Sequence, residues 1–138
     1  MSENLDLVRS IYAEWERGDY RSTDWADPEI EVVIDDGVAP DIWRGLANTA
    51  KGFREFLNSW EDLRDVVEEY REIDEERVLV PVRLTGRGRT SGLELADIGS
   101  RAAYLFHIRD GKVRRLALYW DRERALADLG LSPEGDAR

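Results

Sequence analysis

The chain of 138 residues contains no cysteine and only one histidine, and these two shortages exclude several classes of site. Without cysteine there can be no disulfide framework and no thiol nucleophile. His107 stands alone, with no neighbouring cluster of ligand residues, which argues against a metal site. We therefore expect no metal ion and no cofactor.

Long apolar runs are missing as well. No segment approaches the roughly 18 apolar residues of a membrane helix, and the N-terminal stretch MSENLDLVRS has neither the basic nor the apolar part of a secretory signal. Acidic residues number 30 against 20 Lys and Arg, and the formal net charge of -10 repels the phosphates of nucleic acids. We expect a cytoplasmic protein that binds neither membranes nor nucleic acids.

Apolar residues at helical spacing predict two long helices in the first half of the chain. The first carries Leu5, Val8, Tyr12 and Trp15 on one stripe. The second is expected at roughly 46–63, although a glycine inside it costs about 1 kcal/mol relative to alanine. Between them we expect a short helical turn that ends at a proline, followed by a strand over IEVVID, residues 30–35.

The second half predicts strands. Segments 66–74 and 77–86 form a hairpin, in which Pro81 suggests an edge position or a bulge. Asp110-Gly111 predicts a tight hairpin turn between the last two strands, since both residues tolerate positive φ. A short helix from Arg122 to Leu129 closes the chain.

Helices followed by a run of strands indicate an α+β fold. We expect a cone-shaped, curved antiparallel sheet wrapped around about three N-terminal helices, with a short C-terminal helix. The chain is expected to form a single domain over residues 1–131, with 132–138 as a flexible tail.

Six short motifs occur along the chain in an order that is typical of one family. They are WERGDY, ADPEIEVV, IWRG, FREFLNSWEDL, HIRDGKVRRL and YWDRERALADLGL. With these motifs the chain resembles the SnoaL-like group of the nuclear transport factor 2-like superfamily over nearly its whole length, and only ELADIGSR at 94–101 departs from the pattern. The resemblance implies a cone with an interior pocket, commonly in a homodimer built through the sheet face. It does not imply one reaction, because the superfamily includes isomerases, cyclases, hydrolases, dehydratases and non-catalytic binding proteins.

The aromatic residues are the main candidates for contacts to a ligand. Each of them could simply fill the core, but a set this large in a cone suits an apolar pocket with a few polar handles. The expected ligand-binding residues are Tyr12, Trp15, Trp25, Trp43, Phe53, Trp60, Phe106, Leu118 and Trp120.

Asp36 is the candidate catalytic carboxylate. The resemblance to ketosteroid isomerases places a base aspartate at this position, and it places the second hydrogen-bond donor of the site at Tyr104. A carboxylate walled by aromatic rings could shuttle a proton beside a carbonyl. The alternative is that Asp35-Asp36-Gly37 is only a solvated turn.

Three further polar residues are weaker candidates for a catalytic role. Alternation places His107 on the opposite face of its strand from Tyr104 and Phe106, away from the cone. Asp121, which directly precedes the last helix, is interpreted as its N-cap rather than as a catalytic group. Asp41 is a lesser candidate at the mouth of the pocket.

Three hypotheses about function follow. The first is a SnoaL-like domain that binds a small apolar or aromatic molecule in the cone. The alternative is an isomerase or cyclase that transfers a proton next to a carbonyl, with Asp36 as base. The third is a non-catalytic interaction domain.

Overall fold

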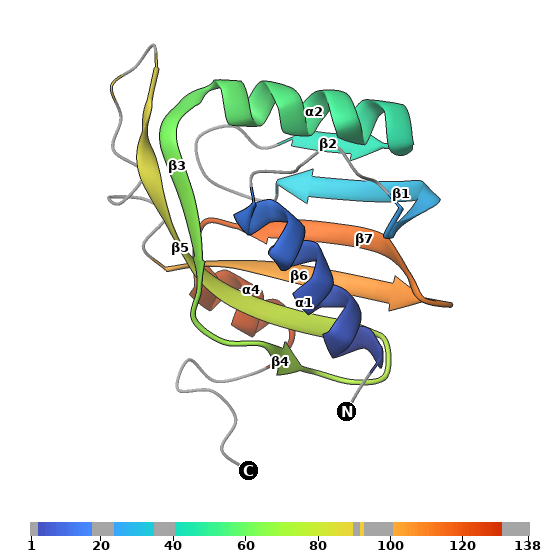
Figure 1. Ribbon diagram of the computed structural model, residues 1–138. Helices are drawn as coiled ribbons and strands as arrows, with labels where there is room; N and C mark the ends of the chain where they lie inside the picture. The colour runs from blue at the N-terminus through green and yellow to red at the C-terminus, as the bar shows by residue number, and fades with distance from the viewer. Residues whose placement is uncertain (1–2, 18–23, 35–40, 90–91, 93–100, 131–138) are drawn as a thin grey trace.

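The computed structural model describes residues 3–17, 24–34, 41–89, 92 and 101–130. These residues form three helices and seven strands (Figure 1). The helices are α1 (Glu3–Glu16), α2 (Leu46–Asn58) and α4 (Arg122–Asp128). The strands are β1 (Ala26–Ile34), β2 (Asp41–Arg44), β3 (Trp60–Val67), β4 (Arg71–Glu72), β5 (Arg77–Gly88), β6 (Ala102–Arg109) and β7 (Lys112–Tyr119).

All seven strands belong to one sheet, in the order β2-β1-β7-β6-β5-β3, with β4 paired to β5 beyond this path. Neighbouring strands are antiparallel except β1 and β7, which run parallel, so the sheet is mixed. Figure 1 shows the sheet curving around α1 and α2. The predicted α+β cone with a C-terminal helix is confirmed.

Two clusters of buried residues hold the layers together. The larger one fills the concave side, where α1 packs against β5 and α2 against β1, β2 and β3. The smaller one lies on the other side, where Ala125 and Leu126 of α4 cover β6 and β7. Figure 1 shows α4 behind the sheet and α1 in front of it.

Helix α1 forms as the apolar stripe predicts. Val8, Ile11, Tyr12 and Trp15 are its buried residues, and their spacing of three and four places them on one face toward the sheet. From the sequence, Ser2 could cap the start of this helix and Gly18 its end; both lie outside the described residues.

The second helix is shorter than predicted, because it ends at Asn58 and Trp60 is already the first residue of β3. Trp60 pairs with Gly88 of β5, so backbone pairing in the sheet replaces the helix at this point. Position 52 of the helix is a glycine because the indole of Trp43 lies against the backbone there and leaves no room for a side chain. A Cβ at Gly52 would stand 2.2 Å from Cδ2 of Trp43.

Two predictions around proline are wrong. The strand predicted from residue 30 begins at Ala26, and Pro28 lies inside it where the pairing with β7 shifts register between Ala26 and Glu31. Pro81 lies on β5, which is an interior strand with β3 and β4 on one side and β6 on the other. No residue of β3 or β4 pairs with Pro81, because the described pairs stop at Val82 and resume at Leu79. Its missing N–H therefore costs no ladder bond there.

The expected closing elements are confirmed. Asp110 and Gly111 have φ of 54° and 74°, as a tight hairpin turn between β6 and β7 requires. The carboxylate of Asp121 accepts a hydrogen bond of 3.0 Å from the backbone N–H of Glu123, so Asp121 is the N-cap of α4.

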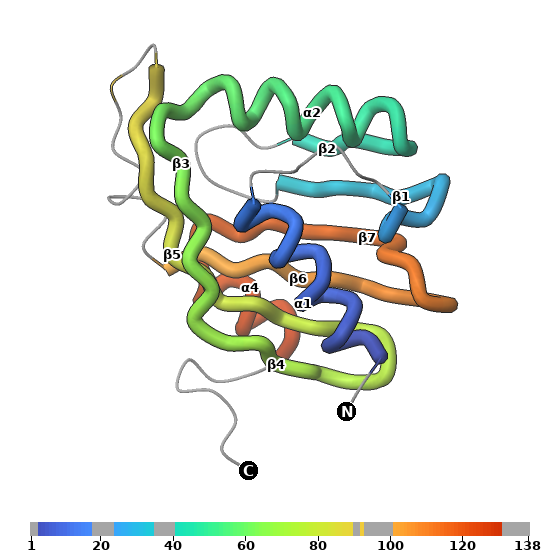
Figure 2. Tube along the Cα trace, viewed as in Figure 1, coloured from blue at the N-terminus to red at the C-terminus, as the bar shows by residue number. Residues whose placement is uncertain are grey.

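Arg122 ties this last helix to three strands. Its guanidinium donates to the backbone carbonyls of Ala102 and Val82, at 3.2 and 3.0 Å. It also lies 2.8 Å from the carboxylate of Glu68, just beyond the end of β3. Figure 2 shows how the chain bends from β3 into β4 and returns along β5 at this side of the molecule.

Candidate functional site

The residues predicted to bind a ligand meet on the concave side of the sheet. All nine, together with Tyr104, belong to the larger buried cluster or pack against it. Many of their rings touch edge to face: Trp15 lies 4.9 Å from Tyr12 and 5.9 Å from Phe53 between ring centroids. Tyr104 lies 6.0 Å from Trp15. These side chains therefore gather on one side of the sheet, and their contact with a ligand stays a prediction.

Among the described residues, two small voids of about 20 Å³ each lie between these rings, each bordered by Phe53, Phe56 and Tyr104. A wider open space on this side of the sheet is a hollow of about 470 Å³ between the C-terminal half of α1 and β3. Its lining residues are Tyr12, Trp15, Glu16, Asp62, Leu63, Arg64, Asp65 and Val66. We call this space the α1–β3 hollow.

A bulge in β3 sets which side chains turn inward along this wall. Asp62 and Leu63 stand opposite the single residue Gly86, because the register shifts by one residue between Glu61 and Arg64. Asp62 has φ of 54°, and a Cβ at Gly86 would lie 3.0 Å from the carbonyl oxygen of Glu61. Beyond the bulge the more buried residues are Leu63, Asp65 and Val67, which alternate with exposed neighbours.

Asp65 is consequently a half-buried carboxylate at the border between the hollow and the aromatic interior. It lines both the α1–β3 hollow and one of the small voids. Burial raises its pKa from 3.8 to about 7; the hydrogen bond from the Tyr104 phenol opposes this shift, and the negative charge of Glu16 adds to it. Its Oδ1 is buried and has no hydrogen-bond partner among the described residues.

Asp65 was not predicted from the sequence. Simple alternation from Trp60 would turn Asp62 and Arg64 inward and Asp65 outward, and only the bulge reverses this. The available signal was its place between Leu63 and Val67, an apolar–acidic–apolar pattern at a spacing of two. Asp36, the predicted base, lies outside the described residues.

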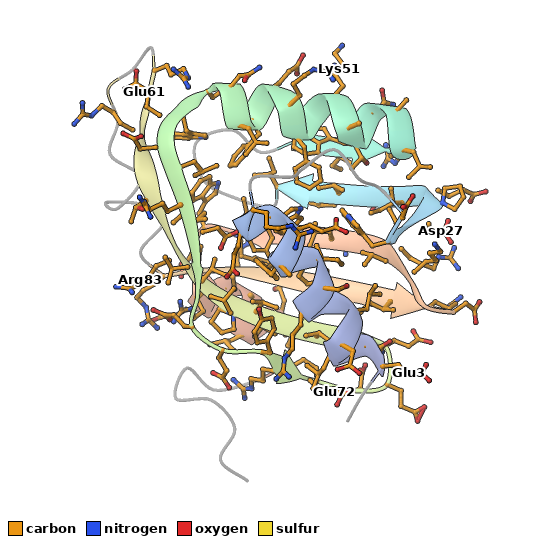
Figure 3. The ribbon with its side chains drawn as sticks, in the orientation of Figure 1. Glu3, Asp27, Lys51, Glu61, Glu72 and Arg83 are labelled. Atoms are coloured by element: carbon orange, nitrogen blue, oxygen red, sulfur yellow. The ribbon has the colours of Figure 1, made fainter. Side chains whose placement is uncertain are left out.

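The other polar candidates lie away from this hollow. Asp41 accepts a hydrogen bond of 3.1 Å from the indole N–H of Trp43, and Arg44 forms an ion pair with Glu31 at 3.0 Å. His107 lies on the outer face of the sheet, as predicted, with its Nε2 2.9 Å from Glu76. The labelled charged residues in Figure 3, such as Lys51 and Arg83, point away from the interior.

The outer face carries a second hollow, of about 590 Å³. Its lining includes acidic residues from the turn before β5, the bases Arg77 and Arg115, and an apolar floor of Leu105 and Ala117. His107 also borders this hollow, so it is separated from the aromatic interior by the sheet itself.

Comparison with known proteins identifies the family. The model of the SnoaL-like domain matches residues 8–116. The chain belongs to the SnoaL-like domain family. No curated protein matches the chain.

Solved structures share the fold of this SnoaL-like domain at low sequence identity. A nuclear transport factor 2-like protein from Burkholderia thailandensis is 18% identical, with 96% of this chain and 100% of that chain covered and a TM-score of 0.75. A second one, from Burkholderia xenovorans, is 26% identical, with 92% and 95% covered and a TM-score of 0.70. A protein of ketosteroid isomerase-like fold from Catenulispora acidiphila, in complex with trimethylamine, is 12% identical, with 94% and 96% covered and a TM-score of 0.65.

Within the described part of this SnoaL-like domain, no three His, Asp or Glu side chains come together in a way that could hold a metal ion. No helix among the described residues is long and apolar enough to cross a membrane. A chemically distinctive group among the described residues is the Asp65–Tyr104 pair, which sets a carboxyl of raised pKa in an aromatic wall.

Proposed function

We propose that this SnoaL-like domain binds a small, largely apolar or aromatic molecule in the α1–β3 hollow. The apolar part of the ligand lies against Tyr12 and Trp15, and its polar end reaches the Asp65–Tyr104 pair. The observation that carries this proposal is a hydrogen-bonded carboxyl set in an aromatic wall beside about 470 Å³ of open space. Sites for small molecules typically combine such apolar lining with a few converging polar groups.

Two other observations support the binding of a small molecule. The volume falls within the roughly 300–1,000 Å³ of typical ligand sites, whereas the inner voids of about 20 Å³ hold no more than a water molecule. The Catenulispora acidiphila relative holds trimethylamine, which is a small ligand in the same fold.

A pair of tryptophan substitutions tests the location. Val66 borders the hollow and is 41% exposed, while Ile42 is 47% exposed and does not border it. We expect Val66→Trp to weaken the binding of 2-phenylethanol, measured by chemical-shift titration, because the indole fills the hollow. Ile42→Trp should bind this probe as the wild type does. Equal affinity in all three chains would place binding elsewhere and overturn the proposal, and no binding in the wild type would favour the interaction-domain hypothesis.

A second candidate function is proton transfer next to a carbonyl, as in an isomerase or cyclase. It is favoured by Asp65, since a general acid or base works best when its pKa lies near the operating pH. Tyr104, which donates to Asp65, would then hold the carboxyl in place. Asp36 stays the alternative base from the sequence.

Exchange of α-hydrogens tests this second candidate. Acetophenone in D₂O should lose its methyl proton signal faster with the wild-type chain than without protein. Asp65→Asn should abolish the acceleration if Asp65 is the base, and Asp36→Asn should abolish it if Asp36 is. If the wild-type chain does not accelerate the exchange, the proton-transfer candidate is overturned and ligand binding remains as the proposed function.

We also propose that the outer hollow is covered by a second copy of the chain. Its acidic turn at 74–76 and its bases Arg77 and Arg115 border the same apolar floor, so two copies related by a two-fold axis can place acids against bases. Sedimentation of the wild type should give a dimer, and Leu105→Glu should give a monomer. A monomeric wild type at high protein concentration would contradict this.

A further inference from the structure

The α1–β3 hollow combines an excess of negative charge with aromatic walls. Three carboxylates border it, from Glu16, Asp62 and Asp65, and one guanidinium, from Arg64. A space lined this way attracts cations, and the low polarity of neighbouring rings strengthens that attraction.

One carboxylate oxygen at this wall lacks a donor. Oδ1 of Asp65 is buried without a hydrogen-bond partner among the described residues. The phenol of Tyr104 serves the same carboxyl group, but it is a single donor for a group with about four lone-pair positions. A buried acceptor without a donor is costly, so a ligand that brings an N–H to this oxygen gains more than it would at the surface.

The aromatic side of the hollow is suited to the same kind of ligand. Tyr12 and Trp15 meet edge to face, with centroids 4.9 Å apart and planes at 74°, so the two rings present differently oriented surfaces. Ring faces attract cations. The guanidinium of Arg9 already makes such a contact nearby, 5.1 Å above the ring of Tyr70, which itself lies 6.0 Å from Tyr12.

We propose that the ligand of the α1–β3 hollow is a protonated amine with an aromatic or apolar body. Its ammonium N–H donates to Oδ1 of Asp65, its charge is balanced by Asp65 and Glu16, and its body lies against Tyr12 and Trp15. This inference rests on the proposed function, because it names the ligand class of the same hollow.

The proposal implies that binding and protonation compete at Asp65. The groups that face Asp65 are Glu16 from α1, Tyr104 from β6 and the Tyr70 phenol, whose pKa is also raised, chiefly by burial and then by Glu16. Two guanidinium groups lie near them, Arg64 at the wall of the hollow and Arg9 over the ring of Tyr70, yet the pKa of Asp65 stays raised. An ammonium ion in contact with the carboxylate holds it ionised, and it should therefore displace the proton from Asp65 when it binds near pH 7.

Two probes of equal size separate charge from shape. 2-Phenylethylamine is protonated at about pH 8, as a lysine-like alkyl amine, and 2-phenylethanol is neutral. Calorimetric titration at low ionic strength should show the amine binding about tenfold more tightly, the size expected of a charge-assisted hydrogen bond. In Asp65→Asn the ratio of the two affinities should fall close to one. Glu69→Gln, which removes one charge from an exposed position, should leave the ratio as in the wild type.

The wild-type chain gives a second readout that needs no substitution. The affinity ratio should decrease from about pH 8 to about pH 5 as Asp65 becomes protonated, and binding of the amine near pH 7 should release protons to the buffer. A ratio near one at about pH 8, or a ratio that Asp65→Asn leaves unchanged, overturns the amine inference while binding of 2-phenylethanol upholds the proposed function. If neither probe binds, the proposed function fails and the inference fails with it.

Discussion

Tyr104 donates a hydrogen bond to Asp65 although the two residues come from strands that are not neighbours. Tyr104 is on β6 and Asp65 on β3, and the whole of β5 lies between them in the sheet. Leu84 of β5 borders the same small void as both residues. The curvature of the sheet brings side chains of β3 and β6 together across β5, so this contact exists only in the folded cone.

The protonation of Asp65 makes stability depend on pH. Its pKa rises from 3.8 to about 7 on folding, so the native state holds an extra proton between these values. The stability gained is fully present below the lower pKa and is lost as pH rises through about 7, by an amount on the order of 2–4 kcal/mol. Urea unfolding of Asp65→Asn should lack this decline, and the variant should be more stable than the wild type at about pH 8. Glu69→Gln should decline as the wild type does; parallel profiles for all three chains would contradict the shifted pKa.

Arg122 should be the most sensitive arginine for stability. Its side chain is 12% exposed and contacts two backbone carbonyls and Glu68. Arg122→Met leaves these acceptors without their donor, and we expect a loss of about 2–3 kcal/mol in the free energy of unfolding. Arg114→Met, at an exposed position of β7, should change it by less than about 0.5 kcal/mol. A similar loss of stability at both positions would show that the positive charge, rather than the hydrogen bonds of Arg122, determines the effect.

Gly52 should resist replacement by the better helix former alanine. The new Cβ would overlap the indole of Trp43, with contacts of 2.2 to 2.6 Å. We expect Gly52→Ala to destabilise the chain by about 1–3 kcal/mol, as overpacking does. The double variant Gly52→Ala with Trp43→Leu should recover part of this loss relative to Trp43→Leu alone. Thermal unfolding of the wild type, the two single variants and the double variant forms a double-mutant cycle. If the changes in stability are purely additive, the clash between the new Cβ at position 52 and Trp43 is contradicted.

Asp121 should contribute to stability as a cap and not to chemistry. Asp121→Ala removes the acceptor for the N–H of Glu123 and should cost about 1 kcal/mol. Asp121→Asn keeps an acceptor oxygen and should cost much less. If instead Asp121→Asn weakened ligand binding while stability stayed unchanged, Asp121 would belong to the binding site.

Where local chemistry decides the structure, the sequence was sufficient. The stripe of α1, the turn at Asp110-Gly111 and the cap at Asp121 each depend on residues within one turn of the chain, and all three are confirmed. The alternation that placed His107 outside the cone is confirmed as well, because β6 is regular from Ala103 to His107.

Prediction failed where distant pairing decides the outcome. Trp60 continues the apolar pattern of α2, yet its backbone pairs with Gly88 and begins a strand. Pro81 is tolerated on an interior strand only because the partner changes from β3 to β4 beside it. The inward orientation of Asp65 depends on both effects. It requires that β3 begins at Trp60 and that the bulge then takes up one residue of the strand.

The bulge at Asp62 and Leu63 therefore adds one residue to β3 without changing which residues of β5 lie opposite the rest of the strand. Beyond it, Asp65 pairs with Leu84, whose side chain is buried on the concave side. Deleting one of the two bulge residues would leave a single residue opposite Gly86 and keep the pairs from Arg64 onward, so Asp65 would still face the interior. The place of this carboxyl is thus set by its partner strand, and the wall of the hollow tolerates a change of one residue in the length of β3.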